Sequence, residues 1–357
     1  MINWNPDKFI FTIPYLDRPI AYYGLCFFLG FLFSYFLTNH VFYRMAIPLF
    51  KFNFNNLKDW PLIIKFFKDH KKDEVVKKVI GRENFSKLKS KIIPDSLKKS
   101  IKVHLNKFIS DNPERNIPIL DQHLKGSPAS VYEITKDLVN HVLMLSVVCS
   151  LIGSRLFHVF FYDWPYYKNH LLEIPMLHEG GLASHGGIIG IFLAWYLFYR
   201  KVKKVIPGFS FWRILDCITI TIGLALGMIR IGNFFNQEII GHATDVPWAV
   251  IFGNPAGGLS AVARHPVQLY ESLSYFSLCL VMFLIWNKKR DSLKAGSYFA
   301  IANILFASAR FVMEYFKVKQ SQSIANDSFL LMGQYLSIPF IALGVIVLIY
   351  LNRKKIH

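Results

Sequence analysis

The chain has 357 residues, of which 53% are hydrophobic and 16% aromatic, and its mean hydropathy is +0.32. This composition excludes an ordinary soluble domain, because the apolar residues come in runs long enough to cross a bilayer. The net charge of +18 must therefore be placed relative to a membrane before it is taken as a sign of nucleic-acid binding.

Seven apolar runs predict an all-α polytopic membrane protein with about seven transmembrane helices. They lie at residues 20–43, 137–161, 182–200, 212–230, 266–287, 296–316 and 330–351. The first run is too long for a signal-peptide core and has no small-residue cleavage site, so we expect an uncleaved helix. The four cysteines lie inside these runs without a pairing pattern, which favours small core or lipid-facing residues over disulfides or metal ligands.

The first run begins with Tyr23-Gly24 at the predicted membrane boundary. A tyrosine at such a boundary is ordinarily part of an aromatic belt. Position alone therefore assigns Tyr23 an anchoring role.

Residues 44–136 form an insert with 20 basic and 10 acidic residues. Helical spacing occurs in Lys71–Lys91 and Pro94–Ile109. One apolar face would be built from Phe66, Phe67, Val75, Val76, Val79, Ile80 and Phe85. The insert is predicted to be a small cytoplasmic helical subdomain, or helices that lie on the anionic inner leaflet. No nucleic-acid-binding motif is present in it.

Three arginines, Arg155, Arg230 and Arg310, lie inside or at the ends of apolar runs. An ionisable group at membrane depth is costly and indicates a functional site, although a single arginine can instead extend its head to the interface. Small or polar neighbours favour the functional interpretation for all three. These neighbours are Gly153-Ser154, Gly232-Asn233, Ser308 and Glu314.

The third run is preceded by Glu179-Gly-Gly-Leu-Ala-Ser-His185-Gly-Gly. Two glycine pairs make a poor lipid-exposed helix, so this stretch is expected to pack against protein or to line a cavity. His185 is a candidate proton acceptor near neutral pH, or a histidine that is hydrogen-bonded for structural reasons. The spacing does not decide between these two roles.

A polar loop at residues 231–265 follows Arg230 directly. Asn233, Asn236 and Glu238 are predicted to form a hydrogen-bonding cluster just beyond the arginine. Gly232 and Gly241 permit close approach of the backbone. The loop ends in Arg264-His265-Pro266, where the fifth helix begins at a proline.

The lysines and arginines predict the orientation of the helices. The alternate loops 44–136, 200–213, 288–294 and 353–355 hold 32 basic residues, and the opposite side holds 6. The positive-inside rule therefore places the N-terminus outside and the C-terminus in the cytoplasm. The three intramembrane arginines then fall in the later parts of the three helices that run outward, at one common depth.

The chain is accordingly expected to have three parts. The first, residues 1–43, is an outer N-terminal segment with the first helix. The second is the basic cytoplasmic insert 44–136. The third, residues 137–357, is the six-helix remainder of the membrane domain, with the outer polar loop 231–265.

Arginines, amides and a histidine at one depth suit a phosphate that carries a lipid tail. Displacement at a carbon bonded to a phosphate ester needs charge stabilisation on the leaving phosphate and a base for the nucleophile. The competing class is a transporter or channel in which Arg155, Arg230 and Arg310 form an anion path, although inverted repeats are not evident. A non-catalytic scaffold would leave the arginines without a purpose.

The most specific motif is Arg230-Ile-Gly-Asn-Phe-Phe-Asn-Gln-Glu238-Ile-Ile-Gly241. Supporting motifs are Tyr23-Gly24, Gly153-Ser-Arg155, Gly180-Gly-Leu-Ala-Ser-His185-Gly-Gly, Arg264-His-Pro-Val-Gln-Leu-Tyr-Glu271, Arg310-Phe-Val-Met-Glu314 and Met332-Gly-Gln-Tyr-Leu-Ser-Ile-Pro339. In these motifs and their order, the chain resembles the prolipoprotein diacylglyceryl transferase family over nearly its whole length except the insert.

The resemblance implies a multi-pass enzyme of the bacterial cell inner membrane that performs the first step of lipoprotein maturation. It would transfer the diacylglyceryl group of phosphatidylglycerol to the lipobox cysteine thiol of a prolipoprotein signal peptide, forming a thioether and releasing glycerol phosphate. Its partners would be these substrates and the lipid bilayer, with no nucleic acid, metal or soluble cofactor.

The resemblance also implies roles for individual residues. Implied catalytic residues are His185, Arg310 and Arg230. Implied phosphatidylglycerol-binding residues are Arg230, Tyr23, Asn233, Glu238, Gly241 and Arg155. Implied supporting residues are Asn236, Glu314 and His265.

The chain departs from the family pattern at three places. Ile229 stands where glycine is common, and Phe306 stands where a tyrosine is common, which removes a hydroxyl near the expected site. Lys319-Gln-Ser replaces a common Pro-Asp. These differences indicate a divergent member whose charged groups are retained.

Overall fold

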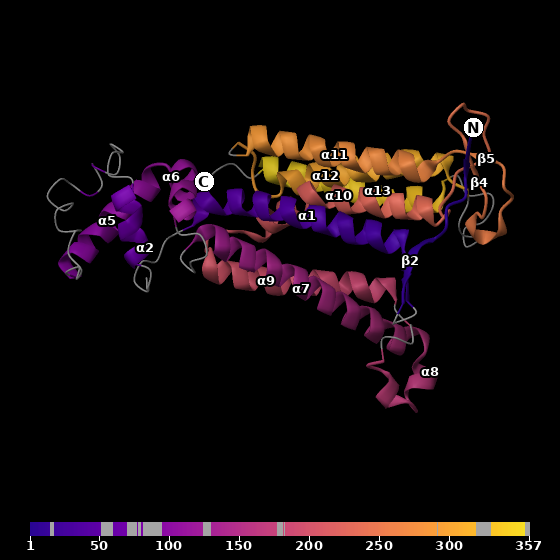
Figure 1. The fold of residues 1–357 in the computed structure, drawn as a ribbon, viewed down its shortest axis with the longest axis horizontal. Coiled ribbons are helices and arrows are strands. Elements are labelled where there is room, and N and C mark those ends of the chain that lie inside the picture. The colour runs from indigo at the N-terminus through magenta and orange to yellow at the C-terminus, as the bar shows by residue number, and fades with distance from the viewer. Residues whose placement is uncertain are drawn as a thin grey trace. The chain divides into compact units, whose positions relative to one another are not determined.

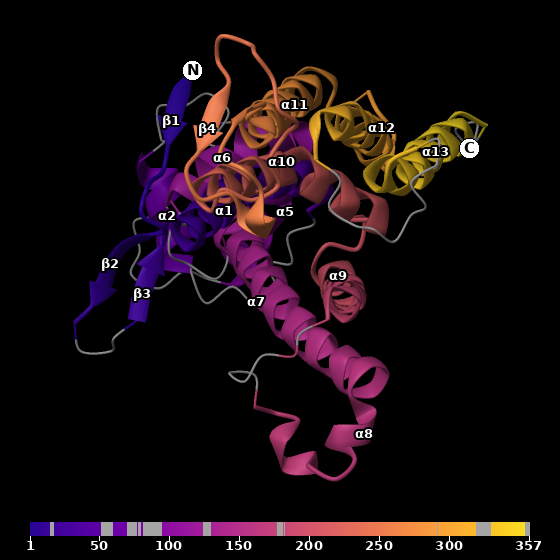
Figure 2. The ribbon, with the colours of Figure 1, turned by 90° about the vertical axis from the view of Figure 1, so that its right-hand side faces the viewer.

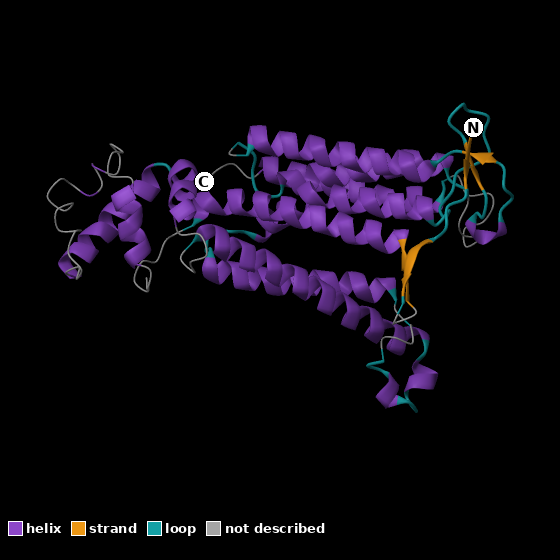
Figure 3. Ribbon diagram, in the orientation of Figure 1, coloured by secondary structure: helices purple, strands orange, loops and turns teal. Residues whose placement is uncertain are grey.

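The structure is a computed structural model. It describes residues 1–14, 18–50, 60–69, 77, 80, 95–123, 130–176, 181, 183–290, 292–318 and 330–353, and most of these are helical (Figure 3). The chain divides into two compact units. Unit 1 comprises Met1–Thr38 and Trp212–His357, and unit 2 comprises Asn39–Phe211.

All seven predicted runs are helices. They are α1 (Tyr22–Ala46), α7 (Val131–Phe157), α9 (Ser184–Val205), α10 (Phe211–Phe235), α11 (Val267–Lys289), α12 (Ser297–Met313) and α13 (Met332–Arg353). Helix α7 continues into a π-helical turn, η3 (His158–Tyr162), and α12 into a 3₁₀ turn, η7 (Glu314–Phe316).

Six of these helices are long and apolar enough to cross a membrane, among the residues that the structure describes. Helix α9 is not one of them, because it begins with Ser184-His-Gly-Gly187 and carries Arg200, Lys201, Lys203 and Lys204 in its last turns. The chain is therefore a helical multi-pass membrane protein with six candidate spans. The seventh predicted span is present as a helix but is not confirmed as a span.

The helices α11, α12 and α13 of unit 1 lie side by side (Figures 1 and 2). Ala300, Val347 and Leu351 form part of the buried contact between α12 and α13. The fully buried carboxylate of Asp216 in α10 accepts hydrogen bonds from the backbone N–H groups of Gly296 (2.7 Å) and Phe299 (2.8 Å) at the start of α12. This carboxylate caps α12, because the first N–H groups of a helix have no partner within it.

Two small sheets were not predicted from the sequence. In the first, β1 (Ile2–Trp4) pairs in parallel with β4 (Val250–Phe252), which pairs antiparallel with β5 (Ala263–Arg264). In the second, β2 (Phe9–Ile13) pairs antiparallel with β3 (Arg18–Ala21). Strands of two to five residues are too short to show an alternating pattern, which explains why they were missed. The first sheet lies at one end of the unit 1 helices (Figure 3).

Helices α7 and α9 of unit 2 lie side by side (Figures 1 and 2), and glycine residues lie at their contact. A Cβ added at Gly153 would meet the backbone of Gly186, and one added at Gly190 would meet the backbone of Cys149. Small residues spaced by four, such as Gly186 and Gly190, allow close helix contact in membranes. The described part of the glycine-rich stretch therefore packs against protein, as the sequence predicted.

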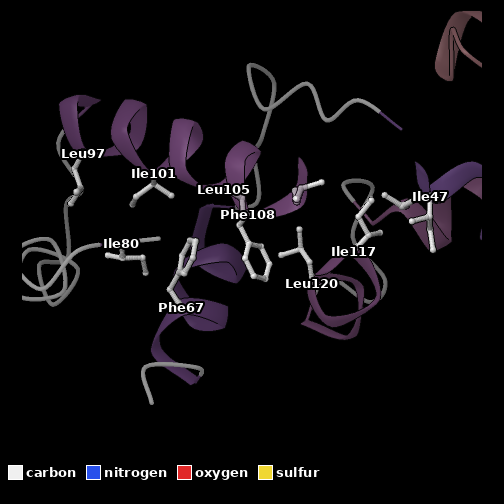
Figure 4. Packing of buried hydrophobic residues seen from close by; sticks show 11 residues of the cluster. Ile47, Phe67, Ile80, Leu97, Ile101, Leu105, Phe108, Ile117 and Leu120 are labelled. Atoms are coloured by element: carbon white, nitrogen blue, oxygen red, sulfur yellow. The ribbon is translucent and has the colours of Figure 1, made fainter. Parts of the chain in front are cut away.

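The insert contains α2 (Trp60–Asp69), α5 (Asp95–Asp111) and α6 (Pro113–His123). Leu97, Ile101, Leu105 and Phe108 form one face of α5 because they recur at helical spacing, and Figure 4 shows them directed toward Phe67. Buried side chains of α6 and of the flanking Ile47 and Val131 complete this cluster.

A shared hydrophobic cluster supports the subdomain interpretation of the insert over separate helices on a membrane surface. Helix α5 confirms the helix predicted at Pro94–Ile109, and Phe67 and Ile80 of the predicted apolar face are buried. Most of Lys71–Lys91 lies outside the described residues.

Candidate functional site

Arg230 lies in the last turns of α10 and begins a chain of hydrogen bonds. Its Nη1 donates to Asn233 Oδ1 at 3.1 Å, and Asn233 Nδ2 donates to Glu238 Oε1 at 2.7 Å. Asn236 Nδ2 donates to the same carboxylate oxygen at 3.3 Å. The cluster predicted from the polar loop is therefore present, and it includes the arginine.

The turn that carries Glu238 has an unusual backbone. Gln237 and Ile239 have φ values of 54° and 56°, a left-handed region that is strained for a β-branched residue such as isoleucine. Gln237 is buried, and its side chain donates to Asn5 and accepts from Asn254 N–H at 2.7 Å. Gln268 Nε2 donates to the Glu238 carbonyl at 2.7 Å. These contacts fix the position of Glu238, and backbone strain of this kind is concentrated at functional sites.

A fully buried carboxylate lies on the other side of Arg230. Glu271 of α11 places Oε2 3.1 Å from Arg230 Nε and Oε1 2.8 Å from Lys317 Nζ. Lys317 Nζ also lies 3.4 Å from Glu314 Oε2, and Glu314 Oε1 accepts from Gly333 N–H at 3.1 Å. These ion pairs link four segments, which are α10 through Arg230, α11 through Glu271, η7 through Glu314, and the residues after η7 through Lys317.

Arg310 is in the last turn of α12. Its Nε atom is buried and has no hydrogen-bond partner among the residues that the structure describes. The hydroxyl of buried Tyr275 accepts a hydrogen bond from Arg230 and lies within electrostatic reach of Arg310. Arg310 as a whole is half-buried, and a guanidinium with a buried donor that has no partner is suited to an anionic ligand.

Tyr23 and Gly241 lie close to this network. A Cβ at Gly232 would meet the Tyr23 ring, which is also within electrostatic reach of Glu238 and Arg230. A Cβ at Gly241 would meet the carbonyl oxygen of His265. Both glycines therefore serve the close approach that the sequence predicted.

His265 is half-buried beside these residues. Its carbonyl accepts from Gly241 N–H at 3.2 Å, its Nδ1 is 3.2 Å from the Tyr270 hydroxyl, and its ring lies edge-on to Phe316. Its contacts are those of a supporting residue, because its backbone and ring both brace the loop that carries Gly241.

His185 belongs to unit 2. It lies in the first turn of α9, is exposed, and stacks on Phe157 at 5.8 Å between ring centroids. Phe157 and Gly186 help to line an apolar groove of about 440 Å³ along α7, η3 and α9. Glu179 and Gly180, which precede this histidine, lie outside the described residues.

Arg155 also belongs to unit 2, and its side chain is buried. Nε donates to the carbonyl of Ile174 at 2.7 Å, and Nη2 donates to the carbonyl of Glu173 at 2.8 Å. The guanidinium carbon lies 5.0 Å from the centre of the Tyr167 ring. These contacts tie the segment after α8 (Trp164–Tyr167) to the end of α7, so much of the binding capacity of this arginine is used within the fold.

Sequence reasoning missed Glu271 and Lys317 as members of the site. In the sequence, Glu271 is the last residue of a motif, and Lys317 is one of the six basic residues on the outer side. The rule that singled out the arginines also applies to Glu271, because an acid in the second turn of an apolar helix is an intramembrane ionisable group. Lys317 had no comparable signal.

The site of unit 1 combines guanidinium groups, amides and a strained turn. Together these groups are suited to bind a phosphate or another anion with hydroxyl groups. The described residues contain no group of three or more histidine, cysteine, aspartate or glutamate side chains placed to bind a metal.

The family model described as prolipoprotein diacylglyceryl transferase matches residues 120–350. A relative in Protochlamydia amoebophila, named phosphatidylglycerol–prolipoprotein diacylglyceryl transferase, is 38% identical over 350 residues, which covers 96% of this chain and 93% of the relative. A relative of the same name in Chlamydia caviae is 31% identical over 356 residues, which covers 99% and 95% of the two chains. Both alignments extend over the insert.

Proposed function

Because this chain belongs to the prolipoprotein diacylglyceryl transferase family, we propose that the cluster around Arg230 binds the phosphate headgroup of phosphatidylglycerol. As a member of that family, the chain transfers a diacylglyceryl group from phosphatidylglycerol to prolipoproteins. The family supports this transfer and not the alternative of an anion transporter.

One observation carries the proposal. Arg230 is held on two sides, by Glu271 and by Asn233, while the buried Nε of Arg310 has no hydrogen-bond partner among the described residues. Both guanidinium groups lie within electrostatic reach of Tyr275. A held guanidinium together with one that has unused donor capacity suits phosphate oxygens, which accept paired hydrogen bonds from arginine.

The reaction is a displacement at the glyceryl carbon. The thiolate sulfur of the lipobox cysteine attacks the carbon bonded to the phosphate oxygen. The carbon–sulfur bond of the thioether forms, the carbon–oxygen bond breaks, and glycerol phosphate leaves with the electron pair. The leaving phosphate gains negative charge during this step, and Arg230 and Arg310 stabilise that charge.

The neighbouring polar groups bind the rest of the headgroup. Glu238, Asn233 and Asn236 offer hydrogen-bonding groups for the glycerol hydroxyls, while Tyr23 and the backbone at Gly241 border them. Glu314 and His265 support the loop and the lysine next to it. Arg155 holds the segment after α8 through Nε and Nη2, and its predicted contact with the lipid stays a prediction.

His185 is the proposed base for the thiol proton. It is exposed at the start of α9, beside an apolar groove, where a neutral imidazole has room to accept a proton directly or through water. Positioning of the thiol is the alternative role, and the two differ in their effect on the pH dependence of transfer.

The protein is placed in the bacterial inner membrane, with its N-terminus outside, its C-terminus and the insert 44–136 in the cytoplasm, and no nucleic acid, metal or soluble cofactor among its partners. Termini on opposite sides need an odd number of crossings, so this arrangement requires α9 to cross the membrane in addition to the six candidate spans. The distribution of basic residues supports the orientation.

Membranes containing Arg230→Ala or His185→Ala should lose transfer of a labelled diacylglyceryl group from phosphatidylglycerol to a lipobox peptide. Arg115→Ala, which removes an exposed arginine of α6, is the matched control and should transfer at the wild-type rate. Wild-type rates from both site variants would contradict the assignment. His185→Gln separates the two roles of the histidine, since loss of a base removes the acidic limb of the pH profile and loss of positioning lowers the rate at every pH.

A further inference from the structure

Glu271 is the most completely buried charged side chain of the site. None of it is exposed, and its two oxygens face different cations, Arg230 on one side and Lys317 on the other. Removing one partner of a buried carboxylate strongly destabilises the folded protein. The burial of Glu271 therefore depends on both Arg230 and Lys317.

Lys317 is also buried, although lysine usually extends its ammonium group to water. Its backbone is bridged to Gly241, and the next residue, Val318, donates from N–H to the carbonyl of Ile240 at 3.1 Å. Its ammonium group is shared between Glu271 and Glu314. The lysine therefore ties the Gly241 segment to the carboxylate that holds Arg230.

Arg230 forms an ion pair through Nε with Glu271 and donates a hydrogen bond from Nη1 to Asn233, and its guanidinium also interacts with the Tyr275 hydroxyl. Two contacts on different nitrogens fix the plane of a guanidinium group, which is what directional binding of phosphate requires. The Asn233 contact belongs to a motif that the sequence already singled out. The Glu271 contact comes from a different helix, α11, and limits rotation of the Arg230 guanidinium about the contact with Asn233.

We propose that Glu271 is a positioning residue that orients Arg230 toward the phosphate, and that Lys317 holds Glu271 in place by balancing its charge. The inference rests on the proposed role of Arg230. It predicts that diacylglyceryl transfer requires the negative charge of Glu271 even in a variant that folds without that charge.

The test is single-turnover transfer from phosphatidylglycerol to a lipobox peptide, measured per folded molecule of purified protein. Glu271→Gln keeps the shape of the side chain and removes its charge, and transfer should fall about 10- to 100-fold. Glu271→Asp keeps the charge with a shorter side chain and should recover part of that loss, which a purely structural role for the side chain would not produce.

The double variant Glu271→Gln/Lys317→Met removes both members of the buried pair. Its thermal stability should be higher than that of Glu271→Gln, because the buried ammonium group of Lys317 is removed together with the charge of Glu271. Its transfer should remain as low as that of Glu271→Gln, because Arg230 still lacks its Nε partner. Recovery of the wild-type rate in the double variant would overturn the inference.

Asp216→Asn is the matched control. It neutralises another fully buried carboxylate of unit 1, which caps α12 and contacts no arginine of the site. Its stability should fall while its transfer per folded molecule stays within about twofold of the wild type.

Arg230→Ala, measured in parallel, distinguishes the proposed role of Arg230 from the proposed role of Glu271. Normal transfer by Arg230→Ala would refute the proposed function of the arginine itself. Loss of transfer by Arg230→Ala with normal transfer by Glu271→Gln would refute only the positioning role.

Discussion

Two buried carboxylates in different units of the protein are stabilised in opposite ways. Asp121 in the insert accepts hydrogen bonds from the Tyr43 hydroxyl (2.7 Å), the Ser130 hydroxyl (3.0 Å) and the backbone N–H groups of Val131 (2.8 Å) and Tyr132 (3.2 Å). All of these donors are neutral, and burial raises the pKa of the Asp121 carboxyl above its usual range. Glu271 in unit 1 instead lies between two cations.

This difference in partners distinguishes a carboxylate that stabilises the fold, Asp121, from one that belongs to the candidate site, Glu271. The donors around Asp121 are used entirely within the fold, where they cap the start of α7 and join it to α6 and α1. The charges around Glu271 instead hold Arg230, and the proposed function adds an anion that would bind Arg230 and the unpaired Nε of Arg310. Substitutions near Asp121 should therefore change stability, and those near Glu271 should change transfer.

Among the variants that distinguish the surroundings of Glu271 from those of Asp121, Arg310→Ala should have the largest effect on transfer. Transfer should fall about 100- to 1,000-fold, which is the usual loss when one preorganised donor to a developing oxyanion is removed. Thermal stability should not fall, because the buried Nε has no hydrogen-bond partner among the described residues. Transfer and unfolding measured on the same purified sample test this, and an unfolded variant would show that Arg310 is structural.

Tyr275→Phe should have an intermediate effect of about tenfold on transfer. The variant removes an acceptor for Arg230, and hydrogen bonds to charged groups are worth about 1.5–3 kcal/mol. The loss should be felt in full because the neighbouring ring, 5.9 Å away between centroids, is Phe306, which has no hydroxyl to replace it.

Tyr22→Phe is the control for this change, because Tyr22 stacks on Phe235 through its ring and keeps that contact without the hydroxyl. Equal transfer rates for Tyr275→Phe and Tyr22→Phe would remove Tyr275 from the site.

Phe108→Ala tests the structural region and should have the smallest effect on transfer. Removing this buried ring from the cluster of Figure 4 should destabilise the insert by about 3–5 kcal/mol. Val103→Ala on the exposed side of the same helix should be nearly neutral. Limited proteolysis of the insert measures both changes, and a transfer rate per folded molecule that falls with Phe108→Ala would show that the insert takes part in the reaction.

The amino-acid sequence was sufficient to predict the helices and part of the site. Hydropathy located all seven helices because each run is close to membrane length. The contacts among Arg230, Asn233 and Glu238 were predictable because these residues lie within nine positions of one another. Local spacing of this kind is readable from sequence.

The rest of the site depends on contacts between distant segments. Glu271 and Lys317 are 46 residues apart in the sequence, and only the packing of α11 against the segment after η7 brings them together. The sequence predicts that the three arginines share one site, and for Arg155 this stays a prediction. Within unit 2 its guanidinium donates to backbone carbonyls. A single sequence does not show which arginine donates to the backbone of its own fold.

The central claim is that the guanidinium of Arg230 stabilises the leaving phosphate. Single-turnover transfer by Arg230→Gln at increasing concentrations of phosphatidylglycerol tests it most directly, since it yields both the apparent lipid affinity and the rate of the chemical step. The account predicts a chemical step about 100- to 1,000-fold slower than in the wild type, with Asp216→Asn unchanged. An affinity and a rate for Arg230→Gln that are both within about twofold of the wild type would contradict it.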